Sequence, residues 1–217
     1  LILFIVEVLV ILILLVVFYV MSKLNKINNT GSLDAKKLNI NIDSETQEVL
    51  DNYTNIAIFG IDNRNSGNYE SGNSDCIMIA SINDDTKEVK LVSVYRDTLL
   101  MVPASGGFND TYRKATEAFF YSGVEATISM INLNLDLNIT DYVMVNFEAL
   151  IRIVDAVGGV DLEITEQELY WLNEYLRDTG LNTGRTYETV PSAGMVHLDG
   201  IQATAYCRIR YADGTLD

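Results

Sequence analysis

The most restrictive feature of this sequence is an N-terminal stretch of 20 residues with a single charged side chain. Residues 1–20 read LILFIVEVLVILILLVVFYV, and Glu7 is the one charge among them. A helix needs about 20 consecutive apolar residues to cross the hydrocarbon core of a membrane. A signal peptide is the alternative, but its apolar region is usually only about 7–15 residues long and precedes a small-residue cleavage site. We therefore expect residues 1–21 to form a retained transmembrane anchor. Because the sequence begins at Leu1 rather than at Met, we expect the true N-terminus to lie upstream.

The chain as a whole is strongly acidic. It has 30 Asp and Glu residues against 15 Lys and Arg, which gives a formal net charge of −15. This balance argues against a nucleic-acid partner, because a broad nucleic-acid surface needs clustered positive charge. Two Cys and two Pro are too few for a disulfide-framed module. We expect Cys76 and Cys207 to be packed free thiols, and a disulfide between them is the alternative if the domain is exported.

The periodicity of apolar residues predicts one α/β domain. Residues 22–52 are polar and are interpreted as a linker, and the domain is expected to span residues 53–217. Apolar runs on either side of the polar turn NDDTK are typical of a β-hairpin. Strands alternating with helices predict a layered fold with a mixed sheet, to which the hairpin contributes the antiparallel part. The expected strands are 55–61, 76–82, 88–95, 141–147 and 160–164, and the expected helices are 112–135 (interrupted around Ser122-Gly123), 148–159, 165–177 and one that follows a capping box at Asp199 and Gln202.

Charged side chains follow several of these strands. In an antiparallel hairpin the start of the first strand lies beside the end of the second, so Asp75 and Arg96 should be neighbours. Asp62 and Arg64 follow the first strand of the domain and reach the same end if that strand runs parallel to the second hairpin strand. Ligands of open α/β sheets bind beyond the carboxyl ends of the strands. We therefore expect a site at this edge of the sheet.

The arginines of the chain favour an anionic ligand at that edge. Arg208 and Arg210 stand two residues apart after the last predicted helix and would point the same way in an extended segment. Arginine forks match phosphate oxygens, and carboxylates together with substrate phosphates form the usual shell of Mg²⁺. The pattern therefore suits a polyanion held through a divalent cation. A purely structural set of ion pairs, in which Arg96 binds Asp75 or Asp97, explains the same spacing equally well.

Four blocks of the sequence resemble the LytR-CpsA-Psr family. They are NIAIFGIDNR, GNSDCIMIASINDDTKEVKLVSVYRDT, DYVMVNFEALIRIVDAVGGVDLEI and HLDGIQATAYCRIR, in the family's order between residues 53 and 213. The resemblance implies a three-layer α/β/α domain with a mixed central sheet and a hydrophobic channel for a lipid. It also implies a membrane-anchored, extracytoplasmic enzyme of the cell wall. Such an enzyme transfers glycopolymers, for example wall teichoic acid or capsule, from a polyprenyl-pyrophosphate carrier to peptidoglycan through a phosphodiester bond.

By motif position, the resemblance implies roles for individual residues. Asp62 and Asp75 would bind Mg²⁺ (or Mn²⁺), and Asp97 would orient Arg96 or assist proton transfer. Asp75, Arg96 and Asp97 are thus the expected catalytic residues. The pyrophosphate would be held by Arg64, Arg96, Arg208 and Arg210.

The sequence departs from the family's usual pattern in three places. Asn73 stands where the family usually has Arg, and Tyr95 stands where Pro commonly precedes the Arg-Asp pair. The sequence also stops at Asp217, before the glycine-rich turn is complete and before the Arg-bearing helix that usually follows. We therefore expect the C-terminal end of the domain to be truncated. Two alternatives to the transferase stay open: a polyprenyl-pyrophosphate hydrolase, and a non-catalytic lipid-binding or regulatory wall protein.

Overall fold

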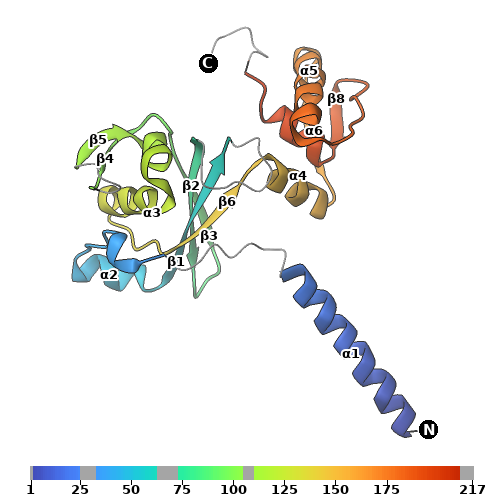
Figure 1. Cartoon of the computed structure of the whole chain (residues 1–217), viewed down its shortest axis with the longest axis horizontal. Helices are drawn as coiled ribbons and strands as arrows, with labels where there is room; N and C mark the ends of the chain where they lie inside the picture. The colour runs from blue at the N-terminus through green and yellow to red at the C-terminus, as the bar shows by residue number, and fades with distance from the viewer. Residues whose placement is uncertain (1, 25–32, 63–72, 105–109, 211–217) are drawn as a thin grey trace. The chain divides into compact units, whose positions relative to one another are not determined.

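The computed structural model describes residues 2–24, 33–62, 73–104 and 110–210. The chain divides into two compact units, residues 1–32 and residues 33–217. The first unit contains helix α1 (Ile2–Leu24), which is formed by the apolar N-terminal stretch (Figure 1). Judged by length and apolarity, none of the helices in the described residues qualifies to cross a membrane. The transmembrane anchor therefore stays a prediction.

The second unit is built on a mixed four-stranded sheet in the order β3-β2-β1-β6. Strand β2 pairs antiparallel with both β1 and β3, whereas β6 runs parallel to β1. The predicted hairpin and the predicted mixed sheet are confirmed. Because β2 is antiparallel to both of its neighbours, β1 and β3 run in the same direction. The strands are β1 (Tyr53–Ile61), β2 (Ser74–Asn83), β3 (Val89–Val94) and β6 (Asp141–Val145).

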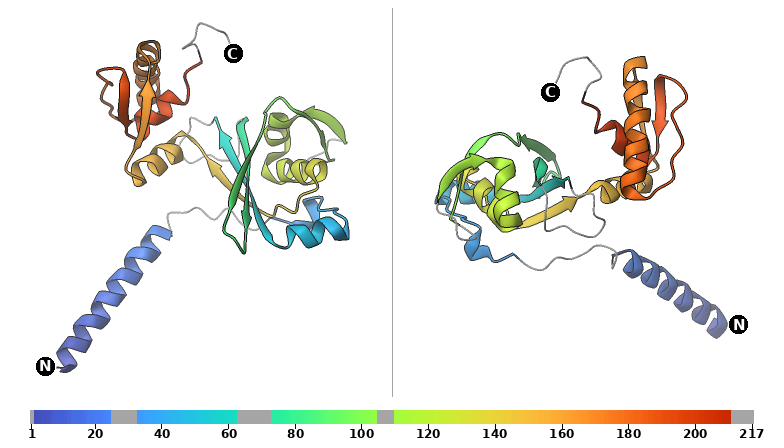
Figure 2. Two further views of the ribbon diagram at one scale, coloured as in Figure 1. Left: turned by 180° about the vertical axis from the view of Figure 1, so that it is seen from behind. Right: turned by 45° about the horizontal axis from the view of Figure 1, so that its top comes forward.

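Alternation of side chains gives the sheet one well-covered face. Ala57 and Phe59 of β1 are fully buried and share this face with Ile77 and Ile79 of β2. Helix α3 (Ala115–Leu135) packs against the face, as both views in Figure 2 show, and the rings of Phe59 and Phe119 lie 6.1 Å apart between centroids. This layer forms the first of two hydrophobic clusters in the unit.

Helix α3 begins at Ala115 rather than at residue 112, because its expected first turn forms strand β5 (Thr111–Lys114). Strand β5 pairs antiparallel with β4 (Leu99–Val102) in a small sheet that sequence periodicity did not predict. Each strand has only four residues, which is too short for a clear alternation. Within α3, Gly123 has φ +74° and ψ −164°, a conformation that glycine adopts readily, so the predicted interruption is confirmed.

The C-terminal elements form a second hydrophobic cluster. Strands β7 and β8 pair antiparallel, and capping boxes begin both α5 and α6. The α6 box joins Asp199 and Gln202, as predicted. Helix α5 extends beyond the predicted residue 177, and β8 was not expected. The elements are α4 (Phe147–Ala156), β7 (Val160–Ile164), α5 (Glu166–Thr183), β8 (Gly194–Leu198) and α6 (Gly200–Tyr206).

Part of the segment interpreted as a linker is folded into the second unit. It contains the 3-10 turn η1 (Ala35–Lys37) and helix α2 (Ser44–Leu50), and Leu38 between them is fully buried. The side chain of Asn132 in α3 holds this segment in place. Its amide nitrogen donates to the backbone oxygens of Leu38 and Ile139, both at 3.0 Å, and its oxygen accepts from the Ile139 nitrogen at 2.9 Å. The polar composition of 33–52 therefore concealed residues that the core requires.

The opposite face of the sheet is apolar and partly exposed. Ile58, Met78, Leu91 and Val143 point to this face, since they alternate with the buried residues in the strand register. Leu91 is 60% exposed and Val143 is 48% exposed. Because these side chains stay open in the part of the chain that the structure describes, the three-layer α/β/α arrangement stays a prediction.

We expect Asn132→Leu to lower the free energy of unfolding by about 2–4 kcal/mol, because the substitution leaves buried backbone groups of Leu38 and Ile139 without partners. Urea unfolding followed by circular dichroism measures the loss. A change within experimental error would contradict the role assigned to this side chain.

Candidate functional site

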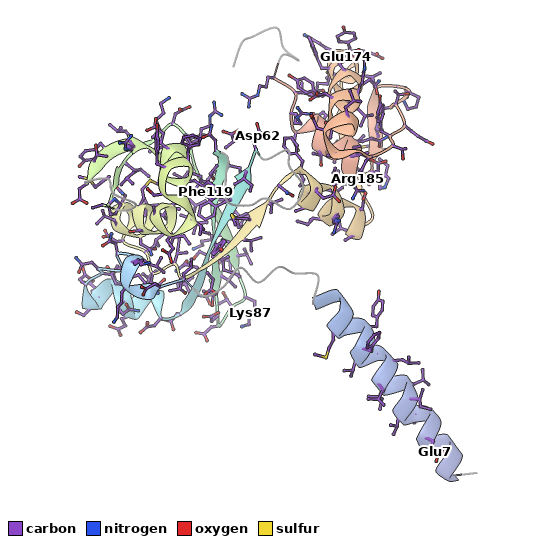
Figure 3. The ribbon with its side chains drawn as sticks, in the orientation of Figure 1. Glu7, Asp62, Lys87, Phe119, Glu174 and Arg185 are labelled. Atoms are coloured by element: carbon purple, nitrogen blue, oxygen red, sulfur yellow. The ribbon has the colours of Figure 1, made fainter. Side chains whose placement is uncertain are left out.

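The ends of three strands bring the predicted charges to one edge of the sheet. The register of β1, β2 and β3 places Asp62, Asp75 and Arg96 at this edge. Lys87 lies in the turn between β2 and β3, at the opposite end of the strands from Asp62 (Figure 3). The prediction made from hairpin pairing is confirmed, because Asp75 and Arg96 are in direct contact. Arg64 lies outside the described residues.

Arg96 is the centre of a chain of ion pairs. Its Nη1 donates to Oδ1 of Asp75 at 2.8 Å, and its Nε lies 3.6 Å from Oδ2 of Asp97. The other oxygen of Asp97 accepts from Nζ of Lys114 at 2.6 Å. The hydrogen bond to Asp75 raises the pKa of Arg96, so its charge is secure. Because 43% of the Arg96 side chain is exposed, the guanidinium is still accessible from solvent.

Lys114 is a site residue that sequence reasoning missed. Strand β5 carries it to Asp97, and the backbone nitrogen of Thr116 donates to the Arg96 oxygen at 3.0 Å, which fixes the start of α3 against the Arg-Asp pair. The hydrogen bond from Lys114 lowers the pKa of Asp97. A carboxylate with a lowered pKa is a poor proton acceptor at neutral pH. The contacts of Asp97 with Arg96 and Lys114 suit the orienting role, and its part in catalysis stays a prediction.

A cavity of about 780 Å³ opens beside this edge of the sheet. Its charged lining consists of Asp62, Asp75, Arg208 and Arg210, which sequence reasoning had assigned to the site. Arg96 is not a lining residue but is bonded to Asp75, which is. Much of the remaining wall is apolar and includes Ile58, Ile61, Val145, Phe147 and Leu150. Since Ile58 lies on the partly exposed sheet face, the cavity is continuous with that apolar surface.

Arg208 makes more side-chain contacts than Arg96 and is less exposed. Its Nη2 donates to Oδ2 of Asp178 at 2.6 Å, and its Nη1 donates to Oγ1 of Thr179 at 2.8 Å. Its guanidinium carbon lies over the rings of Phe147 and Tyr175, at 5.1 and 5.5 Å from their centroids. Only 14% of the side chain is exposed. The partners on α5 are far from Arg208 in sequence, and no motif pointed to them.

The two cysteines line the same cavity and are free thiols. The expectation of free thiols is confirmed, but Cys76 and Cys207 are exposed rather than packed in a core. Desolvation of the sulfur atoms raises the pKa of both thiols. At neutral pH they are therefore protonated and contribute small, weakly polar surfaces to the wall.

The carboxylates of the cavity fit the donor set of a magnesium ion that also binds phosphate. No group of three or more His, Cys, Asp or Glu side chains within the described ranges could hold a metal. Asp62 and Asp75 nevertheless line one cavity. Mg²⁺ is usually bound through only one or two carboxylates, with substrate phosphates and water completing its shell. Two carboxylates are therefore enough for a magnesium ion that also binds phosphate, and the metal stays a prediction.

Comparison with known proteins identifies the family. The LytR_cpsA_psr family model matches residues 14–217. This chain belongs to the LytR_cpsA_psr family. Its relatives include the polyisoprenyl-teichoic acid–peptidoglycan teichoic acid transferase TagU of Enterococcus faecalis, 30% identical over 158 residues, which cover 73% of this chain and 46% of that protein. TagU of Bacillus cereus strain AH820 is 30% identical over 162 residues, with coverages of 73% and 45%. The chain thus spans about half the length of the curated relatives that it matches.

Solved structures share the fold. A LytR-CPS2A-psr family protein YwtF (TagT) with bound octaprenyl pyrophosphate lipid superposes with a TM-score of 0.51 at 23% identity, covering 87% of this chain and 64% of that one. A structure described as a transcriptional regulator from Enterococcus faecalis has a TM-score of 0.53 at 28% identity, with coverages of 80% and 53%. The mixed α/β architecture predicted from the sequence is therefore that of the family.

We expect Lys114→Met to raise the pKa of Asp97, because the substitution removes the hydrogen bond that lowers it. Since the folded pKa of Asp97 is depressed, its ion pairs stabilise the fold at pH values above the ordinary carboxyl pKa, and this contribution is lost as the pH falls through the folded pKa. Carboxyl ¹³C NMR titration measures the change. The control Lys90→Met alters an exposed lysine of β3 and should leave Asp97 unchanged. Equal pKa values for Asp97 in wild type and Lys114→Met would refute the assignment.

Proposed function

We propose that this protein transfers a glycopolymer from a polyprenyl-pyrophosphate carrier to peptidoglycan and forms a phosphodiester bond. One observation carries the proposal: a single cavity joins Asp62, Asp75, Arg208 and Arg210 to an apolar wall. Such a cavity suits an amphiphile with a diphosphate head and a hydrocarbon chain. The names of the teichoic acid transferase relatives and the octaprenyl pyrophosphate in a structural relative support the same class of ligand.

The apolar wall would bind the prenyl chain. Ile58, Val145 and Leu150 line the cavity, and the sheet face continues beyond it through Met78 and Leu91. Covering apolar surface contributes roughly 25 cal/mol per Å² removed from water, so a long prenyl chain on this surface would be bound strongly. In the three-layer α/β/α arrangement, which belongs to this proposal, a second helical layer would cover the remainder of the face.

The charged wall would bind the diphosphate. Phosphoryl transfer depends on positioning and charge stabilisation rather than on a covalent nucleophile. Arg208 and Arg210 would donate to phosphate oxygens from the cavity wall, and Arg96 would donate from beside Asp75, with its orientation set by Asp97. When bound by Asp62 and Asp75, Mg²⁺ supplies further charge neutralisation at the phosphate oxygens.

The transfer step is balanced without any further co-reactant. A sugar hydroxyl of peptidoglycan forms a bond to the phosphorus that carries the polymer. The bond from that phosphorus to the bridging oxygen of the diphosphate breaks, and polyprenyl phosphate leaves with that oxygen. The proton lost by the hydroxyl is taken up by the leaving phosphate. In the hydrolase alternative, water replaces the sugar hydroxyl. The arginines would stabilise the same leaving group in both reactions.

We also propose that α1 anchors the protein in the cell membrane with the catalytic domain outside the cytoplasm. The helix has 23 residues, and Glu7 is the one acidic residue in it. An extracytoplasmic domain would face both the lipid-linked donor and the peptidoglycan acceptor.

We expect Arg208→Ala and Arg96→Ala each to lower the transfer rate about 100-fold or more, because each removes a donor to charge that develops on the phosphates. The assay uses the full-length protein with a lipid-linked wall polymer and peptidoglycan fragments, and it measures coupled product. Arg152→Ala is the matched control, since Arg152 is paired with Glu148 on the surface of α4 and does not line the cavity. Wild-type rates in both site variants would refute the proposal. Release of phosphorylated polymer without coupled product would instead support the hydrolase.

We expect EDTA to abolish the transfer and Mg²⁺ or Mn²⁺ to restore it. Asp62→Asn should raise the metal concentration needed for half-maximal rate, because an amide oxygen binds a hard cation more weakly than a carboxylate. Asp85→Asn removes the same charge in the turn between β2 and β3 and should leave the metal requirement unchanged. Full activity in EDTA would contradict the assignment of the metal to this cavity.

A further inference from the structure

Asp178 contacts a residue of the site, but the proposed chemistry assigns no role to its carboxylate. It is bonded to Arg208 at 2.6 Å, the shorter of the two hydrogen bonds of this guanidinium to side chains of α5. We propose that Asp178 pairs with Arg208 while the cavity is empty and competes with the diphosphate for this arginine. The pairing thereby weakens diphosphate binding and speeds its release. This inference rests on the proposed function.

Asp178 is not required to keep Arg208 in place. The hydroxyl of Thr179 donates its own proton to the backbone oxygen of Tyr175 at 2.7 Å, so its oxygen is turned to accept from Nη1 of Arg208. Thr179 is fully buried, which makes this contact rigid. The rings of Phe147 and Tyr175 also contact the guanidinium. Three neighbours other than Asp178 therefore fix the orientation of the arginine.

The contribution of Asp178 is then mainly electrostatic. Its side chain is 51% exposed, whereas the Arg208 side chain is 14% exposed and lines the cavity. A guanidinium has five N–H donors, and the bonds to Thr179 and Asp178 use two of them. A phosphate can therefore approach from the cavity side, but it meets an arginine whose charge is already partly neutralised. The carboxylate also repels the incoming anion.

This arrangement differs from the one at Arg96. The partner of Arg96 is Asp75, which lines the cavity and is assigned to the metal. Asp178 does not line the cavity, and the proposed chemistry assigns it no contact with the metal or the diphosphate. Removing its charge should therefore change the affinity of the arginine for an anion without removing a group that touches the substrate.

The size of the effect follows from the loss of one partly screened negative charge beside the guanidinium. We expect Asp178→Asn to tighten diphosphate binding roughly three- to tenfold. Most of the gain should lie in slower dissociation, because affinity differences among variants of one site are mostly differences in off-rate. Salt should reduce the gain, since it screens interactions of partly exposed charges. A purely structural role for Asp178 predicts the opposite sign, namely weaker binding at every salt concentration.

The experiment measures farnesyl pyrophosphate binding to the full-length protein by calorimetry and stopped-flow at low and high salt. Five proteins are compared: wild type, Asp178→Asn, Asp178→Glu, Glu174→Gln and Arg208→Ala. Glu174 is the matched control because it is an exposed carboxylate one turn earlier on the same helix, as labelled in Figure 3. We expect tighter binding in Asp178→Asn, wild-type affinity in Asp178→Glu and Glu174→Gln, and weaker binding in Arg208→Ala.

The outcomes separate this inference from the proposed function. Unchanged or weaker binding in Asp178→Asn, with Arg208→Ala still impaired, would overturn the role of Asp178 and leave the diphosphate site intact. An equal gain in Glu174→Gln would also overturn it, because the effect would then reflect the general charge of α5. If Arg208→Ala binds as well as wild type, or no variant binds at all, the diphosphate site itself is wrong and both proposals fail.

Discussion

The antiparallel register of β1, β2 and β3 is the constraint on which the site depends. A slip of one residue would turn Phe59 and Ile77 out of the core and reverse the faces of the sheet, so burial fixes the register strongly. With the register fixed, the ends of β1 and β3 and the start of β2 coincide. Asp62, Asp75 and Arg96 then lie at one edge of the sheet without needing a specific attraction between them, and the ion pair between Asp75 and Arg96 follows from the fold.

The candidate site takes its parts from both hydrophobic clusters. The strands of the central sheet lead into Asp62, Asp75 and Arg96, and the C-terminal elements supply Arg208, Phe147 and Tyr175. Arg96 and Arg208 are each paired with a carboxylate, which suits a protein whose net charge is −15. An anion that binds these two arginines would therefore exchange partners with existing ion pairs. Such exchange would lower the affinity but keep binding reversible, which suits the proposed transfer reaction and the release of its lipid product.

The fold was predictable from the sequence wherever alternation and turn chemistry were strong. The hairpin of β2 and β3, the break at Gly123 and the capping box at Asp199 all have local signals, and the structure contains each of them. The pairing of Asp75 with Arg96 followed from the hairpin alone. Strands β4, β5 and β8, and buried residues in polar surroundings such as Leu38, have no comparable local signal, because tertiary contacts decide their conformation.

Two ion pairs of the site could not be predicted, because they too depend on tertiary contacts. Lys114 reaches Asp97 only because β5 folds back on β4, and Asp178 reaches Arg208 only because α5 and α6 pack together. These pairs are separated in the sequence by 17 and 30 positions and lie in no common motif. Sequence reasoning therefore located Asp97 and Arg208 but not their partners Lys114 and Asp178.

The central claim is that one cavity binds both halves of a prenyl pyrophosphate. A crystal structure of the full-length protein with farnesyl pyrophosphate tests this claim most directly. Our account predicts the diphosphate within hydrogen-bonding distance of Arg208 and the prenyl chain against Ile58 and Val145. A diphosphate bound elsewhere, or a prenyl chain that leaves the apolar wall empty while the head group is in place, would contradict it.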